Sequence, residues 1–297
     1  MTFSGVFPPA VTPFKDGEVD LAAARRNARE YMKTALRGVL ALGTNGEAAY
    51  LEGDEPERLI AALREEVPRG RLLLAGAGRD STRATIAAVR QAAAAGADAV
   101  LVRPPMAFKS QMTAGALVRH YSAVADASTV PVLLYNFPAA FGAELTVEAI
   151  HELSEHRNIA GIKESGLEVL KIADDVAQCR AGFAVLCGAA PVFYPSLAVG
   201  AAGGILAVAC LIPDLCVRLF ELARDGRHDE ARELQARLTP LARTVTTVYG
   251  VPGLKAAMDL AGMAGGEPRA PLAPASAEAV ATIRTQLAEL GVAATTP

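Results

Sequence analysis

The sequence predicts an α/β fold in which eight parallel strands close into a (β/α)8 TIM barrel, followed by a C-terminal helical extension. Short apolar runs alternate with longer, alanine-rich amphipathic segments, and this unit recurs at a spacing of roughly 20 to 35 residues. The apolar runs are continuous, as is typical of parallel strands that are covered on both faces. After residue 225 the alternation stops, and only helical patterns follow.

The expected elements follow one another in a regular order. The strands are Gly5–Ala10, Gly38–Leu42, Leu72–Ala75, Ala99–Val102, Pro131–Tyr135, Ile159–Lys163, Phe183–Cys187 and Gly203–Leu206. Helical patterns between and after them cover residues 20–36, 55–66, 81–95, 113–126, 146–155, 167–178, 191–199 and 213–225. Three more cover residues 228–247, 252–262 and 276–290. We therefore expect a catalytic barrel domain over residues 1–225 and a helical appendage over residues 226–297.

A doubly wound open sheet is the alternative fold. Such sheets usually have fewer strands and carry a glycine-rich phosphate loop after the first strand. Here the first strand leads into Val11–Gly17, which has no G-x-G-x-x-G pattern. The segment Gly76–Ser81 resembles that pattern but lacks its third glycine, so we interpret it as a tight turn.

The composition and net charge of the chain exclude several classes of function. Of the 297 residues, 52% are hydrophobic and 21% are charged, which is typical of a globular chain. With a net charge of −3, the chain presents no excess of basic residues for nucleic acid or an anionic membrane. The longest apolar run, Leu197–Ile212, is shorter than the ~18 residues that a membrane-spanning helix needs, and glycines interrupt it.

The cysteines and the N-terminus indicate a cytoplasmic enzyme. The chain has four cysteines in no C-x-x-C pair, and we expect isolated, buried thiols in a reducing compartment. The first residues lack a basic region ahead of an apolar stretch, so no signal peptide is predicted. No histidine has zinc-ligand spacing, and all four fall on helical stretches, where we expect a surface role. We therefore expect no metal site.

Lys163 is the first candidate for chemistry. Catalytic groups of a (β/α)8 barrel lie where strands pass into βα loops, and Lys163 ends a buried strand. Burial disfavours the charged form of an amine, and a neutral amine is a nucleophile toward carbonyls. The protonated imine that results is an electron sink, which lets an adjacent C–C bond break. A solvent-facing lysine at a strand end is the alternative interpretation.

Tyr135 ends the preceding strand, and sequential strands are neighbours in such a barrel. Its side chain is therefore expected at the same mouth as Lys163, where a phenol hydroxyl can shuttle protons while an imine forms. The alternative is a buried tyrosine whose hydroxyl caps a turn.

The third candidate is the loop Gly43–Glu47, after the second strand. Its small residues, free N–H groups and short polar side chains suit a carboxylate, although an ordinary loop has a similar composition. An amine, a phenol and a carboxylate cradle at one opening are what Schiff-base chemistry on a 2-oxo acid requires. The sequence therefore favours a class I lyase or aldolase.

Four motifs make the chain resemble the dihydrodipicolinate synthase/N-acetylneuraminate lyase family of class I aldolases over essentially its whole length. They are the G-[TS]-[TN]-G-E loop at Gly43–Glu47, the Y-[NS]-x-P strand end at Tyr135–Pro138, the G-[IMV]-K-[ED]-S segment at Gly161–Ser165 and the signature at Tyr249–Lys255. The resemblance implies a pyruvate-dependent carbon–carbon lyase that uses no cofactor, acts on a small-molecule 2-oxo acid and assembles as a homotetramer.

The resemblance also implies roles for single residues. Lys163 would form the imine, Tyr135 would relay protons, and Thr44 would assist them. The substrate-binding residues would be Thr44, Asn45, Gly46, Ser165, Gly188 and Ile205, the last two through their backbone.

Two departures from the synthases of this family concern the substrate. The synthases carry a tyrosine after the fourth strand that enters the neighbouring subunit's site, but here no tyrosine is present and Phe108 lies near its place. They also carry an arginine that holds the carboxylate of the aldehyde substrate, and Ala140 stands at that position. Asn45, Ser165 and the segment Gly250–Pro271 instead resemble those of 4-hydroxy-2-oxoglutarate aldolases.

We therefore expect reversible aldol cleavage of a 4-hydroxy-2-oxo acid, such as 4-hydroxy-2-oxoglutarate, to pyruvate and an aldehyde. Three alternatives stay open: a 4-hydroxy-tetrahydrodipicolinate (dihydrodipicolinate) synthase that condenses pyruvate with aspartate semialdehyde, a 2-keto-3-deoxy sugar acid aldolase or dehydratase, and a non-enzymatic 2-oxo acid sensor. The presence of Lys163 and Tyr135 counts against the sensor, because binding alone needs no nucleophile.

Overall fold

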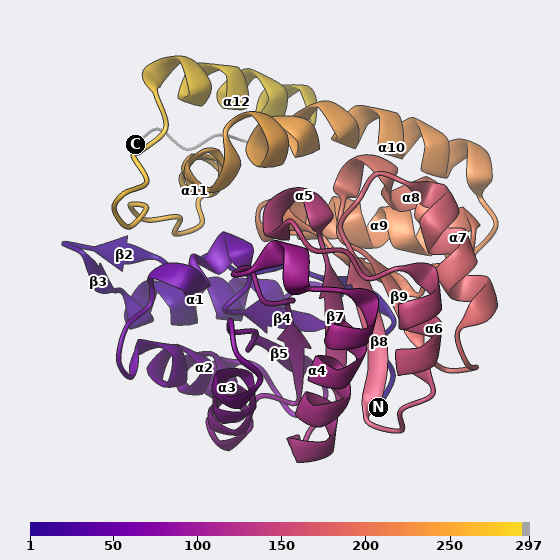
Figure 1. Ribbon diagram of the computed structural model, residues 1–297. Coiled ribbons are helices and arrows are strands. Elements are labelled where there is room, and N and C mark those ends of the chain that lie inside the picture. Colours follow the sequence, from indigo (N-terminus) through magenta and orange to yellow (C-terminus); the bar gives the residue numbers. More distant parts are fainter. Residues whose placement is uncertain (293–297) are drawn as a thin grey trace.

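Eight parallel strands form the main sheet of the computed structural model, which describes residues 1–292 (Figure 1). The strands are β1 (Gly5–Phe7), β4 (Gly38–Ala41), β5 (Leu72–Gly76), β6 (Ala99–Val102), β7 (Val132–Asn136), β8 (Ile159–Glu164), β9 (Ala184–Cys187) and β10 (Gly203–Ile205). They are hydrogen-bonded in the order β1-β10-β9-β8-β7-β6-β5-β4, and a parallel bridge between Pro9 and Leu40 joins the two ends. The predicted (β/α)8 barrel is thus confirmed, and the open sheet is excluded.

Helices connect the strands and cover the outside of the barrel (Figure 1). They are α1 (Leu21–Met32), α2 (Glu55–Glu66), α3 (Thr82–Ala94), α4 (Ala114–Ala127), α5 (Pro138–Phe141), α6 (Val147–Ser154), α7 (Val169–Gln178), α8 (Phe193–Ala198) and α9 (Pro213–Arg224). Several start at predicted positions because a polar side chain accepts a hydrogen bond from a backbone N–H of the first turn. These N-caps are Asp20, Ser81, Thr113 and Thr146.

The C-terminal extension consists of α10 (His228–Arg243), α11 (Gly250–Leu260) and α12 (Ala277–Glu289), with a π-helical turn at Thr244–Val248. Figure 1 shows α10 and α12 along one side of the barrel, with α10 beside α9. The helical extension was predicted, but the π-helical turn was not. The division into two domains at residue 225 stays a prediction, and the end of the second expected domain lies outside the described residues.

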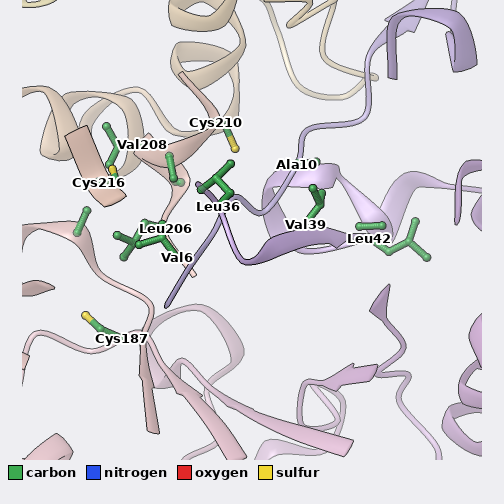
Figure 2. Packing of buried hydrophobic residues seen from close by; sticks show 14 of the residues in the cluster. Val6, Ala10, Leu36, Val39, Leu42, Cys187, Leu206, Val208, Cys210 and Cys216 are labelled. Carbon is green, nitrogen blue, oxygen red and sulfur yellow. The ribbon is translucent and has the colours of Figure 1, made fainter. Parts of the chain in front are cut away.

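The hydrophobic core has two layers, because side chains alternate between the two faces of each strand. The inner cluster fills the barrel and contains Phe3, Phe7, Leu40, Leu72, Leu74, Ala99, Leu101, Leu133, Tyr135, Phe141, Ala184, Leu186 and Ile205. The residues between them, such as Val39, Leu73 and Leu134, belong to the outer cluster against the helices. Figure 2 shows a part of the outer cluster around Val6, Val39 and Leu206.

Two smaller features complete the barrel. An antiparallel hairpin of β2 (Phe14–Lys15) and β3 (Glu18–Val19) follows β1 and was not predicted. Its two-residue turn is Asp16–Gly17, and both residues have positive φ, as the turns favoured in hairpins require. The apolar run at 197–212 is the end of α8, β10 and a turn of 3-10 helix, as expected. None of the described helices is long and apolar enough to cross a membrane.

Candidate active site

Lys163 and Tyr135 point into the barrel at its mouth. They are register partners on neighbouring strands β8 and β7, near the carboxyl end of each. Tyr135 belongs to the inner cluster with Leu133, and Lys163 has the same strand parity as Gly161, while Ile162 faces the helices. Lys163 Nζ donates a hydrogen bond to Tyr135 Oη at 3.2 Å and lies 4.3 Å from the ring centroid. The amine and the phenol are therefore in direct contact.

The surroundings of Tyr135 favour its ionised form. Burial by itself would raise the pKa of the phenol. The Lys163 ammonium opposes this effect, and the hydroxyls of Thr44 and Ser165 act in the same direction as the ammonium, so that the pKa of Tyr135 lies below its usual value. A phenol of this kind gives up and regains a proton more readily than tyrosine in water does.

The loop after β4 places Thr44 beside this phenol. Thr44–Gly46 is a turn of 3-10 helix that ends at Glu47 in the left-handed conformation, with φ of 51°. The Thr12 hydroxyl donates to the Gly46 carbonyl at 2.6 Å and holds the loop against the N-terminal segment. The Thr44 side chain is exposed toward the cavity described below, whereas Asn45 and Gly46 do not line that cavity.

Glu47 ties the same loop to the C-terminal extension. Its carboxylate lies 2.5 Å from Lys255 Nζ, and both side chains are 1% exposed. Lys255 also donates to the carbonyl oxygens of Thr12 and Glu267, each at 2.8 Å, and Arg269 N donates to Glu47 at 2.8 Å. The extension therefore anchors the turn that carries Thr44. We did not predict this contact, although both ends lie in motifs that the sequence displays.

Ser165 and Gly188 lie directly behind the amine. Ser165 N donates to the Asn136 carbonyl at 3.0 Å, and Gly188 N donates to the Glu164 carbonyl at 2.5 Å. A Cβ added to Gly188 would overlap the Ser165 hydroxyl and lie 2.9 Å from Lys163 Cε, so this position requires glycine.

Ile205 lies deeper in the barrel, fully buried in the inner cluster. Of the residues predicted for the site, the structure thus gathers Lys163, Tyr135, Thr44, Ser165 and Gly188. Only Thr44 and Tyr135 of the predicted residues line the cavity described next; Lys163, Ser165, Gly188, Asn45, Gly46 and Ile205 do not.

A cavity of about 540 Å³ opens at this end of the barrel. Thr44 and Tyr135 line it, together with Ala140 and the arginines Arg79 and Arg103. Lys163 is 6% exposed and does not itself line the cavity, but it donates a hydrogen bond to Tyr135, which does. Among residues 1–292, no group of three or more histidine, cysteine, aspartate or glutamate side chains gathers as metal ligands would.

The profile of the Dihydrodipicolinate synthetase family matches residues 2–290. The chain belongs to this family. A probable mitochondrial 4-hydroxy-2-oxoglutarate aldolase from Emericella nidulans is 38% identical over 93% of this chain and 92% of its own. A 4-hydroxy-tetrahydrodipicolinate synthase from Methanothrix thermoacetophila is 37% identical over 97% of both chains.

Solved structures of the family have the same fold. A dihydrodipicolinate synthase from Thermotoga maritima superposes with a TM-score of 0.94 at 31% identity, covering 98% of this chain and all of the other. A structure described as the first monomeric dihydrodipicolinate synthase variant superposes with a TM-score of 0.93 at 32% identity, covering 98% and 97% of the two chains. The protein is thus an enzyme of the lyase and aldolase class to which the family's named members belong.

A buried polar network on the outer face of the same strands was not predicted. Asn136 Nδ2 donates to the two Glu164 carboxylate oxygens at 2.9 and 3.1 Å. Lys171 Nζ lies 3.1 Å from Glu164 and 3.5 Å from Asp175. Burial raises the pKa of Glu164 to about 7 and that of Asp175 to about 6, against the attraction of Lys171. In the sequence, a polar residue directly follows Tyr135 and another directly follows Lys163. This pattern could have indicated polar side chains on the outer face of the two strands.

The expectation for the histidines was wrong at His120. This residue lies on the α4 face that packs inward with Leu117 and Tyr121, at helical spacing, and is buried. Its Nδ1 lies 2.9 Å from Thr82 Oγ1. Burial, and to a smaller extent Arg103, lower the pKa of His120 to about 4, so the ring is neutral at pH 7. His156 follows α6 instead of lying on a helix.

Proposed function

We propose that the protein is a class I aldolase that cleaves a 4-hydroxy-2-oxo acid, such as 4-hydroxy-2-oxoglutarate, to pyruvate and an aldehyde. The observation that carries the proposal is the contact between Lys163 Nζ and Tyr135 Oη at the barrel mouth. It brings a nucleophile and a proton relay to one reacting carbonyl, which is the arrangement that covalent catalysis through an imine needs.

The first half of the reaction forms the imine. The Lys163 nitrogen attacks C2 of the substrate, a C–N bond forms, and the carbonyl electron pair moves to oxygen. Tyr135 donates a proton to this oxygen, takes one from nitrogen and then donates that proton to the carbinolamine hydroxyl, which leaves as water, so that a protonated C=N bond and a Tyr135 phenolate remain. Thr44 and Ser165, whose hydroxyls act on the Tyr135 phenol, keep that proton mobile.

The second half breaks the carbon–carbon bond. The Tyr135 phenolate takes the C4 hydroxyl proton, so that C4–O becomes the carbonyl of the leaving aldehyde, and the electron pair of the C3–C4 bond moves toward the iminium nitrogen. The enamine takes a proton at C3, and water then hydrolyses the imine to release pyruvate. The hydroxyl of Thr44 and the amide groups of Asn45 and Gly46 would hold the C1 carboxylate, and the backbone at Gly188 and Ile205 would border the pyruvate end.

Ala140 favours cleavage over synthase chemistry. A synthase has to hold an aldehyde that carries its own carboxylate, and Ala140 offers no donor where the synthases carry an arginine. Phe108, which is 81% exposed, has no hydroxyl to relay a proton. Relatives bear the names of both activities, so the synthase is the second candidate. Sugar-acid chemistry and a 2-oxo acid sensor are further alternatives.

Reductive trapping tests the covalent step. Incubation with pyruvate and borohydride is expected to add one reduced pyruvate to the peptide that contains Lys163. Lys171, which two carboxylates hold on the outer face, is the internal control and should stay unlabelled. A label on another lysine, or no label, would contradict the proposal.

A ratio of two reactions tests the substrate. We expect kcat/KM for pyruvate release from 4-hydroxy-2-oxoglutarate to exceed kcat/KM for condensation of pyruvate with aspartate semialdehyde by at least about tenfold, the effect of one missing charge-assisted hydrogen bond. Both are measured on one preparation, with pyruvate release coupled to NADH oxidation. Faster condensation would replace our proposal by the synthase.

We also propose that the chain assembles as a homotetramer and that it acts in the cytoplasm. Exposed apolar side chains at Phe108, Leu167 and Leu170 support association of the chain. Sedimentation analysis tests it, because a monomer, like the variant described for one structural neighbour, would contradict it.

A further inference from the structure

The cavity that begins at Tyr135 and Thr44 also has a cationic part. Arg79 and Arg103 line it, from the loops that follow β5 and β6. Arg103 Nη1 lies 3.2 Å from Asp80 Oδ1, and Met106 N donates to the same oxygen at 2.8 Å. Asp80 thus forms an ion pair with Arg103, and of the two arginines only Arg79 has no ion-pair partner among the described residues.

Arg79 is the arginine without an ion-pair partner. Among the described residues it forms no ion pair, and its Nη1 donates only to the adjacent Gly78 carbonyl at 3.1 Å. Its side chain is half-buried. Burial lowers the pKa of Arg79, the charge of Arg103 adds to this effect, and Glu57 opposes it. A half-buried cation beside a second cation is stabilised when an anion binds.

The backbone under both arginines is fixed. Thr85 Oγ1 accepts from Arg79 N at 3.1 Å and donates to Arg79 O at 3.2 Å. Gly78 packs directly on Arg103, since a Cβ at that position would lie 2.6 Å from Arg103 N. Two arginines on a fixed backbone therefore line a cavity that extends to Tyr135, the hydrogen-bond partner of Lys163.

We infer that Arg79, with Arg103 beside it, binds the second carboxylate of a five-carbon diacid whose 2-oxo end reacts with Lys163. The inference rests on the proposed function for the identity of the reacting end. It assigns the distal carboxylate of the substrate to the loops after β5 and β6, not to the loop after β7, where Ala140 offers no donor. A guanidinium fork holds a carboxylate with two parallel hydrogen bonds, which selects diacids over uncharged analogues of the same length.

A matched pair of ligands tests the assignment without requiring cleavage. 2-Oxoglutarate and 2-oxopentanoate have the same carbon chain, and they differ only in a distal carboxylate or methyl group. The half-saturating concentration of each is measured from borohydride trapping at Lys163. We expect wild type to prefer the diacid by about 10- to 100-fold.

Arg79→Met keeps an unbranched stem and removes the guanidinium group with its charge. We expect it to abolish most of the diacid preference and to leave trapping of 2-oxopentanoate within about twofold of wild type. Arg79→Lys keeps the charge without the fork and should lose part of the preference. Arg83→Met is the control, because Arg83 is exposed on α3 and does not line the cavity.

The outcomes separate the two proposals. In one outcome, pyruvate labels Lys163 while wild type shows no diacid preference; in another, Arg79→Met weakens the binding of 2-oxoglutarate and 2-oxopentanoate equally. Either result would contradict the proposed carboxylate site and leave the proposed aldolase activity uncontradicted. If neither pyruvate nor 2-oxoglutarate is trapped at Lys163, the proposed function and the inference that depends on it are both overturned.

Discussion

The two faces of strands β7 and β8 carry different chemistry at adjacent residues. On the inner face Tyr135 and Lys163 share one hydrogen bond next to a cavity. On the outer face Asn136 and Glu164, the next residues along each strand, belong to a closed network with Lys171. Lys163 is buried, and the side chain of Lys171, which reaches the outer face from α7, is only 15% exposed, so low exposure alone does not distinguish a reactive amine from a structural one.

The difference lies in the partners of the two amines. Lys171 lies within ion-pair distance of two carboxylates, Glu164 and Asp175, which occupy its donors. Lys163 has a phenol as its partner and no carboxylate within ion-pair distance among the described residues. An amine without a counter-ion is the one that a carbonyl can engage. The following predictions test this comparison.

The largest effect is expected for the inner amine. Lys163→Ala should abolish turnover, because no other group on the inner face can form the imine. Lys171→Met should retain turnover per folded molecule to a far greater extent. Steady-state assays of both variants, normalised to the folded fraction from circular dichroism, measure the contrast. Equal losses would remove the distinction between the two faces.

The inner phenol comes next. Tyr135→Phe keeps the ring and removes the hydroxyl, and we expect a loss in kcat of about 10²–10⁴, the usual contribution of general acid–base catalysis. Half-saturation by pyruvate should change much less, because the amine remains. Near-normal turnover would mean that water or another group relays the proton and that Tyr135 is structural.

The outer network should affect stability more than chemistry. Lys171→Met leaves two buried carboxylates without their cation, which typically costs about 3–5 kcal/mol in the free energy of unfolding. Urea denaturation at pH 7 measures the loss. Lys33→Met is the control, because Lys33 pairs with Glu30 in solvent and such pairs contribute about 0–1 kcal/mol. Similar losses in both variants would show that the network is not stabilising.

The smallest effect concerns pH. Folding raises the pKa of Glu164 to about 7 and that of Asp175 to about 6, so the unfolded chain loses these protons first as pH rises. Their contribution to stability is therefore complete in acid, below the unfolded pKa values, and is lost as pH rises toward 7. Glu164→Gln should flatten this part of the stability profile between about pH 4 and 7. An unchanged slope would mean that Glu164 does not titrate there.

The barrel and the pair of Lys163 and Tyr135 could be predicted from the sequence, because both depend on the order of strands and helices along the chain. Continuous apolar strands separated by helices define a parallel barrel, and the parity of each strand follows from the chain itself. The positions of Lys163 and Tyr135 at the ends of consecutive strands therefore predicted their meeting at one mouth. The hairpin at residues 14–19 was missed because its strands have only two residues each.

Contacts between distant segments were decided by the tertiary structure alone. The pairing of Glu47 with Lys255 joins residues far apart in the chain, and no local pattern relates them. In the same way, only the fold shows that Arg103 is matched by Asp80 while Arg79 is not, although all three are visible as charges in the sequence. Periodicity determines which face a side chain occupies. Which charges meet there, and which one stays unpaired at a cavity, depends on how the loops of different strands pack at the barrel mouth.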